Sequence, residues 1–393
     1  MHYNTIFSQL FQFIPRHRFD KAVGTGGSDH YCKHFTAWRQ FLTCLYAQIT
    51  GKDSLREICD GLLTNQSRLY HLGMEPVARS TLSDAMNRRA PSVFGELFNE
   101  LLARCEKLAP GHGFRFHNPL FAIDSTTIAV SLNAYDWARY RTNKGAVKLH
   151  TQLNLSGNLP CFVVMSNGKM SDIQAARKWF RIEPDSIYTY DKGYCDYAWF
   201  KEIDDEGAFF VTRLKRNARL KVAGQHLSPN ERLGVVADEV VEPELPNARE
   251  AYPGRLRRVV FHDAEGDRDF VFLTNNFRLA AATIAAIYRK RWQIELFFKW
   301  IKQNLQIKTF LGTSENAVMT QIWAALVHFL LVAYIKFLGR VKINLAEITA
   351  RLREHLMGKS NLLELLSLDR KTLAKPPDWN EPRQLELFGE FFT

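Results

Sequence analysis

The sequence predicts an α/β protein whose mixed β-sheet core is interrupted by a β-rich insertion and preceded by a helical N-terminal domain. Two changes in pattern support this prediction. Apolar residues recur at helical spacing up to about residue 110, whereas after Gly113 short runs rich in β-branched and aromatic residues alternate with helical segments. Residues 214–280 are more polar and contain strand-like runs, and a long helix follows them. Three strands followed by alternating helices and strands are typical of a mixed α/β sheet.

The first region, residues 1–115, is expected to consist of helices separated by Gly and Pro. Ser80 or Thr81 suits the N-cap of one of these helices, which ends in Asn87-Arg88-Arg89. The helical segments are predicted at residues 35–49, 55–63, 80–89 and 92–108.

The sheet core is predicted at residues 116–213 and 281–340. Its strands are expected at residues 119–124, 146–153, 161–165, 186–190 and 208–212, with helices at 172–180 and 197–204. The insertion, residues 214–280, contains Pro243 and Pro246 and strand-like runs at 256–261 and 269–273. One long helix is expected from about 281 to 305, then an apolar helix, and residues 341–393 are predicted to form a C-terminal helical tail.

Charge and cysteine usage narrow the classes of function. The chain has 52 Lys and Arg against 41 Asp and Glu, a net charge of +11 and a pI near 9.3, which favours a polyanionic partner such as nucleic acid or an anionic membrane. Its 6 cysteines form no C-x-x-C pair and its histidines show no zinc spacing, so neither a disulfide framework nor a zinc site is expected. Residues 322–338 are apolar, but His328 and Lys336 favour a buried helix over a membrane span. We therefore expect a cytoplasmic protein with no membrane partner.

The long helix carries the most informative segment, residues 288–302. Four of its polar residues fall within an arc of about 60° on a helical wheel: Tyr288, Arg291, Glu295 and Lys302. Apolar residues lie beside this arc, so the helix is expected to bury one stripe and to present a polar stripe along its edge. In one interpretation Glu295 shares a metal ion while Arg291 and Lys302 hold phosphates. In the other, Arg291 and Glu295 form an ordinary surface ion pair.

Two aspartates favour the first interpretation. Asp124 ends the run F-A-I-D and Asp191 ends the run I-Y-T-Y-D, so both are expected just past hydrophobic strands. A lone Asp at such a place is usually a turn former or a helix cap, yet open α/β sheets keep their sites there. Two such carboxylates, joined by Glu295 from a neighbouring helix, form an all-oxygen cluster that suits Mg²⁺ or Mn²⁺ rather than zinc. Phosphoryl transfer uses two such ions about 3.5–4 Å apart.

The same residues carry a resemblance to a known family. The spacing Y-x2-R-x3-E-x6-K from Tyr288 onward is similar to the Y-R-E-K signature of bacterial insertion-sequence transposases of the IS-four type. These belong to the wider DDE group, which has an RNase-H-like catalytic core. Asp124 in F-A-I-D-S-T-T and Asp191 in Y-D-K-G-Y resemble the first two acidic motifs of that family, and the resemblance covers roughly residues 119–338. It implies that Asp124, Asp191 and Glu295 are catalytic and that they hold two Mg²⁺ or Mn²⁺ ions.

The resemblance implies a DNA transposase that cleaves and joins strands at the ends of an insertion sequence by a cut-and-paste mechanism, through a hairpin intermediate. The implied partners are double-stranded DNA, both terminal inverted repeats and target, and a second copy of the chain in a homodimer on DNA. Tyr288, Arg291 and Lys302 are then implied to contact DNA, and a bacterial, nucleoid-associated protein is expected. Two alternatives remain open: a metal-dependent nuclease with the same core that cannot join strands, and a DNA-binding regulator that has lost catalysis.

Further DNA contacts are expected from aromatic and basic residues. Related enzymes capture a flipped base with a tryptophan of the insertion domain, and the matching position here is Phe270, which either stacks on a base or belongs to the strand core. Arg213 and Lys215 leave the last core strand toward the insertion, where they contact phosphate or form a solvated turn. Arg88 and Arg89 end a helix of the N-terminal domain, interpreted either as a DNA-recognition helix or as a packing module.

Overall fold

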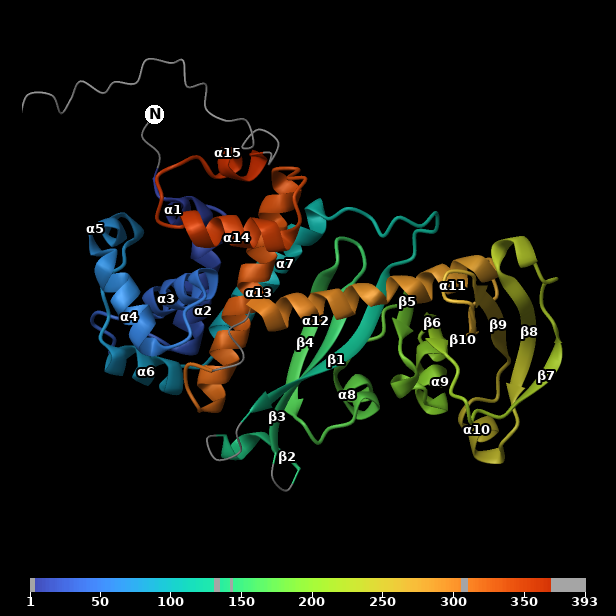
Figure 1. Cartoon of the computed structure of the whole chain (residues 1–393). Coiled ribbons are helices and arrows are strands. Elements are labelled where there is room, and N and C mark those ends of the chain that lie inside the picture. The colour runs from blue at the N-terminus through green and yellow to red at the C-terminus, as the bar shows by residue number, and fades with distance from the viewer. Residues whose placement is uncertain (1–3, 131–134, 142–143, 305–309, 369–393) are drawn as a thin grey trace, which may run out of the picture.

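The computed structural model describes residues 4–130, 135–141, 144–304 and 310–368 (Figure 1). The N-terminal region is helical, as predicted. Its longer helices begin and end at residues with a physical reason to do so: α3 starts where the Thr36 hydroxyl accepts the Arg39 N–H and ends at Gly51, whose φ of 70° is left-handed. The helices are α1 (Ile6–Phe11), α2 (Arg16–Gly26), α3 (Ala37–Thr50), α4 (Leu55–Thr64), α5 (Gln66–Leu69), α6 (Arg79–Arg88) and α7 (Ser92–Leu108).

The apolar helix α13 (Glu315–Leu338) lies at the centre of this helical region, where it packs against α3, α6 and α7. Among the described residues it is the one helix long and apolar enough to cross a membrane, and 83% of its apolar window is buried inside the protein. The prediction of a buried helix is therefore confirmed. Helices α14 (Leu345–His355) and α15 (Leu362–Ser367) join the same bundle, since backbone N–H groups of α1 donate to carbonyls that follow α14.

The core sheet contains five strands in the order β4-β3-β1-β5-β6. β3 pairs antiparallel with both β1 and β4, whereas β5 pairs parallel with β1 and β6 pairs parallel with β5. This mixed sheet confirms the predicted RNase-H-like fold class. The strands are β1 (Leu120–Val130), β3 (Lys144–Asn154), β4 (Leu159–Asn167), β5 (Ile187–Tyr190) and β6 (Phe209–Arg213), and the short β2 (Arg139–Arg141) pairs with β3.

The β-rich stretch after β6 continues the same sheet. β10 pairs antiparallel with β6, and β9, β8 and β7 follow it outward. As a consequence Arg213 of β6 lies opposite Phe272 of β10. The added elements are β7 (Leu220–Gln225), β8 (Val235–Pro243), α10 (Pro246–Ala251), β9 (Leu256–Asp263) and β10 (Arg268–Thr274).

Different helices cover the two faces of the sheet. Because side chains alternate along a strand, Phe121 and Ile123 of β1 pack in one core with α8 (Asp172–Trp179) and α9 (Tyr197–Asp205), while Leu120 and Ala122 pack in the other. On that second face α11 (Ala281–Lys290) and α12 (Trp292–Asn304) run across the molecule from the insertion strands to the N-terminal helices (Figure 1). The prediction of one uninterrupted helix is wrong at a single residue, Arg291, where the helical hydrogen bonding tightens to i→i+3.

Candidate active site

Asp124 and Asp191 lie on neighbouring parallel strands at the point where the pairing of these strands ends. β1 and β5 pair up to Ile123 and Tyr190, and the next residue on each is the aspartate. Since adjacent strands lie about 4.8 Å apart, this register brings the two carboxylates to one place at the carboxyl end of β5. Asp191 follows its strand, as predicted. Asp124 does not end its strand, because pairing with β3 extends β1 to Val130.

The turn after β5 orients the Asp191 carboxylate. Its Oδ1 accepts the Gly193 N–H at 2.7 Å. A Cβ added at position 193 would lie 2.8 Å from that oxygen, so any side chain there would displace the carboxylate. Gly193 is thus a site residue that the sequence prediction missed, although it stands within the quoted motif Y-D-K-G-Y.

Arg291 connects Glu295 with Asp124. Its Nη2 donates to Glu295 Oε1 at 2.5 Å, and its Nη1 lies 3.5 Å from Asp124 Oδ2. The Arg291 side chain is only 12% exposed, so its pair with Glu295 differs from the exposed surface pair of the alternative interpretation. Strand register thus places Asp191 beside Asp124, and Arg291 contacts both Asp124 and Glu295.

Burial governs the protonation of Asp124. Desolvation raises the pKa of Asp124 to about 7; Asp191 and Asp172 raise it too, whereas the Ser125 N–H and Arg291 lower it. Like charges therefore face each other across this cluster, and a further cation would be stabilised there.

Within the part of the chain that the structure describes, no three acidic, histidine or cysteine side chains are arranged as a ready metal site. The Arg291 guanidinium lies between two of the three carboxylates and supplies positive charge to both. The shared metal site remains a prediction, which requires that Arg291 give up at least one of these contacts.

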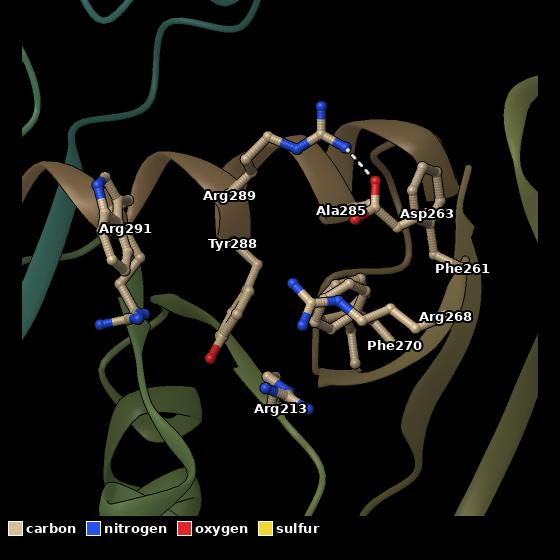
Figure 2. Close-up of a pocket in the computed structure, with 11 residues that line it drawn as sticks. Arg213, Phe261, Asp263, Arg268, Phe270, Ala285, Tyr288, Arg289 and Arg291 are labelled. Carbon is tan, nitrogen blue, oxygen red and sulfur yellow. Dashed lines mark ion pairs between the residues drawn. The ribbon is translucent and has the colours of Figure 1, made fainter. Parts of the chain in front are cut away.

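A cavity of about 310 Å³ opens beside the cluster, between β10 and α11 (Figure 2). Its aromatic wall contains Phe270, Phe272 and Tyr288: the Phe270 and Phe272 rings stack 6.0 Å apart, and the Phe272 and Tyr288 rings are 5.0 Å apart. Cations line it as well, since the guanidinium carbons of Arg213 and Arg268 lie 4.9 Å and 4.7 Å from the centre of the Phe270 ring. Figure 2 shows the Tyr288 hydroxyl pointing toward the side where Arg213 and Arg291 lie.

The cavity brings together predicted and unpredicted residues. Phe270, Tyr288, Arg213 and Arg291 were predicted to contact DNA, and all four line it. Arg268 was missed, although Arg268, Phe270 and Phe272 recur at every second residue of β10 and hence share one face of the strand.

The remaining predicted DNA contacts lie outside the cavity. Lys302 is exposed on α12, about two turns beyond Glu295. Lys215 donates to the Cys195 carbonyl at 2.8 Å and so ties two loops together. Arg88 is exposed at the end of α6.

Arg89 is engaged within the N-terminal helices. It donates to the Phe35 carbonyl and, at 3.0 Å, to Gln40 Oε1, and it lies 3.7 Å from Asp29 Oδ1. With its side chain 15% exposed, Arg89 fits the packing module, whereas Arg88 is free to face a partner.

Comparison with known proteins adds to this geometry. The family model described as the transposase DDE domain matches residues 115–331, and a domain of unknown function matches residues 2–75. The chain is 34% identical to a protein from Sinorhizobium fredii that carries the name transposase y4zB, over 271 residues, 68% of this chain and 74% of the relative. It is 31% identical over 258 residues (65% and 67%) to a protein of Geobacillus stearothermophilus named as a transposase for insertion sequence element IS5377. Among solved structures, the piggyBac transposase synaptic complex with hairpin DNA aligns over 95% of this chain and 83% of that chain, with a TM-score of 0.47 and 10% identity.

Proposed function

As a member of the family of transposases with a DDE domain, this chain is a DNA transposase, and we propose that Asp124, Asp191 and Glu295 are its catalytic carboxylates. One observation carries the assignment. Strand register places Asp124 beside Asp191, and Arg291 joins Asp124 to Glu295, all within the matched domain. These side chains come from distant parts of the chain, so their meeting is a property of the fold.

The donor set fits the divalent ions that transposases of this family generally use. Three carboxylates offer only oxygen, the ligand that Mg²⁺ and Mn²⁺ prefer. Burial is the main cause of the raised pKa of Asp124, and the neighbouring Asp191 and Asp172 raise it further, so a divalent cation bound beside Asp124 would stabilise its ionised form. Two ions bound there would activate the attacking oxygen and stabilise the leaving oxygen of the phosphodiester.

Arg291 has a second role in this proposal. When DNA enters, a backbone phosphate competes with the two carboxylates for its guanidinium, since both are anions that bind arginine in the same geometry. Transfer of Arg291 to phosphate releases Asp124 and Glu295 for the metal. Lys302, exposed farther along α12, holds another phosphate of the same strand.

The cavity between β10 and α11 is proposed to receive a base that leaves the duplex. Its volume of about 310 Å³ lies at the small end of ligand pockets, and aromatic rings stack on any base. A 2-aminopurine placed at each of the terminal positions of the end DNA in turn should brighten at the one position where the base leaves the stack. In Phe270→Ala this increase should be smaller while duplex binding remains, whereas an unchanged signal at every position of the wild-type complex would refute base capture.

The DNA is proposed to be the terminal inverted repeats of the element and its target, bound by a homodimer. The full chain should cleave a labelled end in Mg²⁺ and join the freed 3′-hydroxyl to a target. Asp191→Asn should do neither, while Asp196→Asn, which alters the cap of α9 five residues later, should do both. Cleavage without joined product would identify a nuclease, and binding without cleavage a regulator.

A further inference from the structure

A fourth carboxylate, Asp172, lies behind Asp124 at the start of α8. Its Oδ1 accepts the Ser125 hydroxyl at 2.5 Å and lies 2.8 Å from Lys148 Nζ. The same Ser125 donates its backbone N–H to Asp124 Oδ1 at 2.8 Å. A continuous path of hydrogen bonds therefore leads from α8 through Ser125 to a proposed catalytic carboxylate.

This path crosses the sheet. Asp124 and Ser125 are consecutive residues of β1, so their side chains point to opposite faces. Asp124 faces Arg291 and α12, whereas Ser125 faces α8 on the other side. α8 is itself fixed at this end by a capping box between Ser171 and Gln174. The anchor of Asp124 is thus separate from the helix that carries Glu295.

Asp172 is 32% exposed, and its protein side is lined by Lys148 and His150. Lys148 is 13% exposed and also donates to the Met170 carbonyl, just before α8. The ring of His150 is fully buried, and its Nδ1, which lacks a hydrogen-bond partner in the described structure, lies 3.7 Å from Asp172 Oδ1. Ser166 donates its hydroxyl hydrogen to the Asn167 carbonyl, so in its hydrogen bond with His150 the Ser166 oxygen is the acceptor. The His150 proton is therefore on Nε2, and Nδ1 carries a lone pair and cannot donate to Asp172. In the described structure, Ser125 donates its hydroxyl to Asp172 and Lys148 forms an ion pair with it.

We propose that Asp172 is a positioning residue of the transposase: by holding Ser125 it fixes the end of β1 and orients the Asp124 carboxylate for metal binding. This inference rests on the proposed catalytic role of Asp124. A purely structural role for Asp172 would stabilise α8 and leave the affinity for metal unchanged.

The test measures Mn²⁺ binding to the full chain bound to an uncleavable end DNA, because DNA is proposed to draw Arg291 away from Asp124 and Glu295. Electron paramagnetic resonance of the free ion gives the affinity, with the same DNA alone as the blank, and the Mg²⁺ dependence of end cleavage is measured beside it. Asp172→Ala and Ser125→Ala should each weaken Mn²⁺ binding by about tenfold or more, the usual cost of losing a partner of a metal ligand. The double variant should be no weaker than either single variant, because one link is removed in each. Asp172→Asn keeps an oxygen that accepts from Ser125 and should bind nearly as well as the wild type.

Glu202→Gln is the matched control, since it removes the charge from the exposed pair between Arg177 of α8 and Glu202 of α9 and should leave Mn²⁺ binding unchanged. Wild-type affinity in Ser125→Ala, or an Asp172→Asn as weak as Asp172→Ala, would overturn the proposal. If Asp172→Ala fails to fold, Ser125→Ala decides alone. Asp124→Asn distinguishes failure of the positioning role of Asp172 from failure of the proposed metal site. If this variant binds Mn²⁺ as the wild type does, the proposed metal site itself is wrong.

Discussion

Two arginine–carboxylate clusters, one in the insertion and one beside the catalytic candidates, differ in how fully they are satisfied. Arg257 and Asp238 are both 0% exposed and form a bidentate pair, with two hydrogen bonds of 2.8 Å. The remaining Nη1 of Arg257 donates to the carbonyls of Asn276 and Leu279. This cluster joins β8, β9 and the segment before α11, and all three guanidinium nitrogens of Arg257 donate hydrogen bonds within it.

The Arg291 cluster is incomplete by comparison. Arg291 makes one short hydrogen bond to Glu295, stands 3.5 Å from Asp124, and keeps a buried Nε without a hydrogen-bond partner in the described structure. Glu295 is 34% exposed and Asp124 22%.

A buried pair that is fully hydrogen-bonded holds one conformation, whereas an incomplete one can exchange partners at low cost. We therefore infer that the Arg291 pair, unlike the fully hydrogen-bonded Arg257 pair, is able to exchange its partners.

The largest expected effect is the loss of DNA cleavage when a carboxylate of the proposed active site is replaced. Glu295→Gln and Asp191→Asn should each lower the rate of end cleavage by about 10³-fold or more, which corresponds to about 4 kcal/mol of transition-state stabilisation. Affinity for the end DNA should change little, because phosphate contacts supply it. Single-turnover cleavage with a gel-shift control measures both, and a Glu295→Gln protein that cleaves at the wild-type rate would remove Glu295 from the site.

The next effect concerns the saturated pair. Asp238→Ala leaves Arg257 charged and buried, so the free energy of unfolding should fall by about 3–5 kcal/mol. Glu295→Ala should lower the free energy of unfolding far less, because Arg291 keeps its contact with Asp124 and its side chain is partly exposed to water. Denaturant titrations of the two variants compare the clusters directly, and equal losses would break the distinction drawn between them.

The sequence predicted those features of the candidate site that depend on local hydrophobic runs and helical spacing. Asp191 was expected at a strand end, and it lies there because the hydrophobic run I-Y-T-Y forms β5. Glu295 was expected on the helix edge beside an apolar stripe, and Ile294 and Phe298 are indeed buried. The RNase-H-like sheet was predicted from the order of strand-like and helical runs together with the resemblance.

The other features of the site depend on contacts between residues far apart in the chain, which no local sequence pattern predicts. β1 extends past Asp124 because β3 pairs with it, and the helix breaks at Arg291 where that side chain turns to Asp124 and Glu295. Arg268 lines the cavity because β10 pairs with β6, and the periodicity of the sequence does not predict this pairing.

A smaller effect links Asp124 to pH in the metal-free protein. Burial raises the pKa of Asp124 from its ordinary value of 3.8 to about 7, so the folded state holds a proton that the unfolded state releases. The resulting stability is present in full below the unfolded pKa and is lost as the pH rises through about 7. Between pH 5 and 8 the wild type should lose about 2–3 kcal/mol more than Asp124→Asn, which cannot titrate at this position. Unfolding curves in EDTA at the two pH values measure the difference, and identical pH dependence in both proteins would contradict the raised pKa.

The smallest expected effect tests whether the Arg291 cluster exchanges its partners. If Arg291 and Lys302 both reach the DNA backbone, replacing either with Ala should reduce the slope of log K against log[salt] by about 0.9, the value for one phosphate contact on duplex DNA. The loss should be the same for specific and random DNA, because phosphate contacts position without specifying. Lys201→Ala is the matched control, since this partly exposed lysine belongs to α9 on the opposite face of the sheet and should leave the slope unchanged. A reduced slope for Lys302→Ala alone would mean that Arg291 stays with Asp124 and Glu295 when DNA binds, and that the incomplete cluster is a fixed neutralising group rather than one that exchanges. A reduced slope for both would require the Arg291 guanidinium to leave at least one carboxylate, which the saturated Arg257 pair cannot do without unfolding its surroundings.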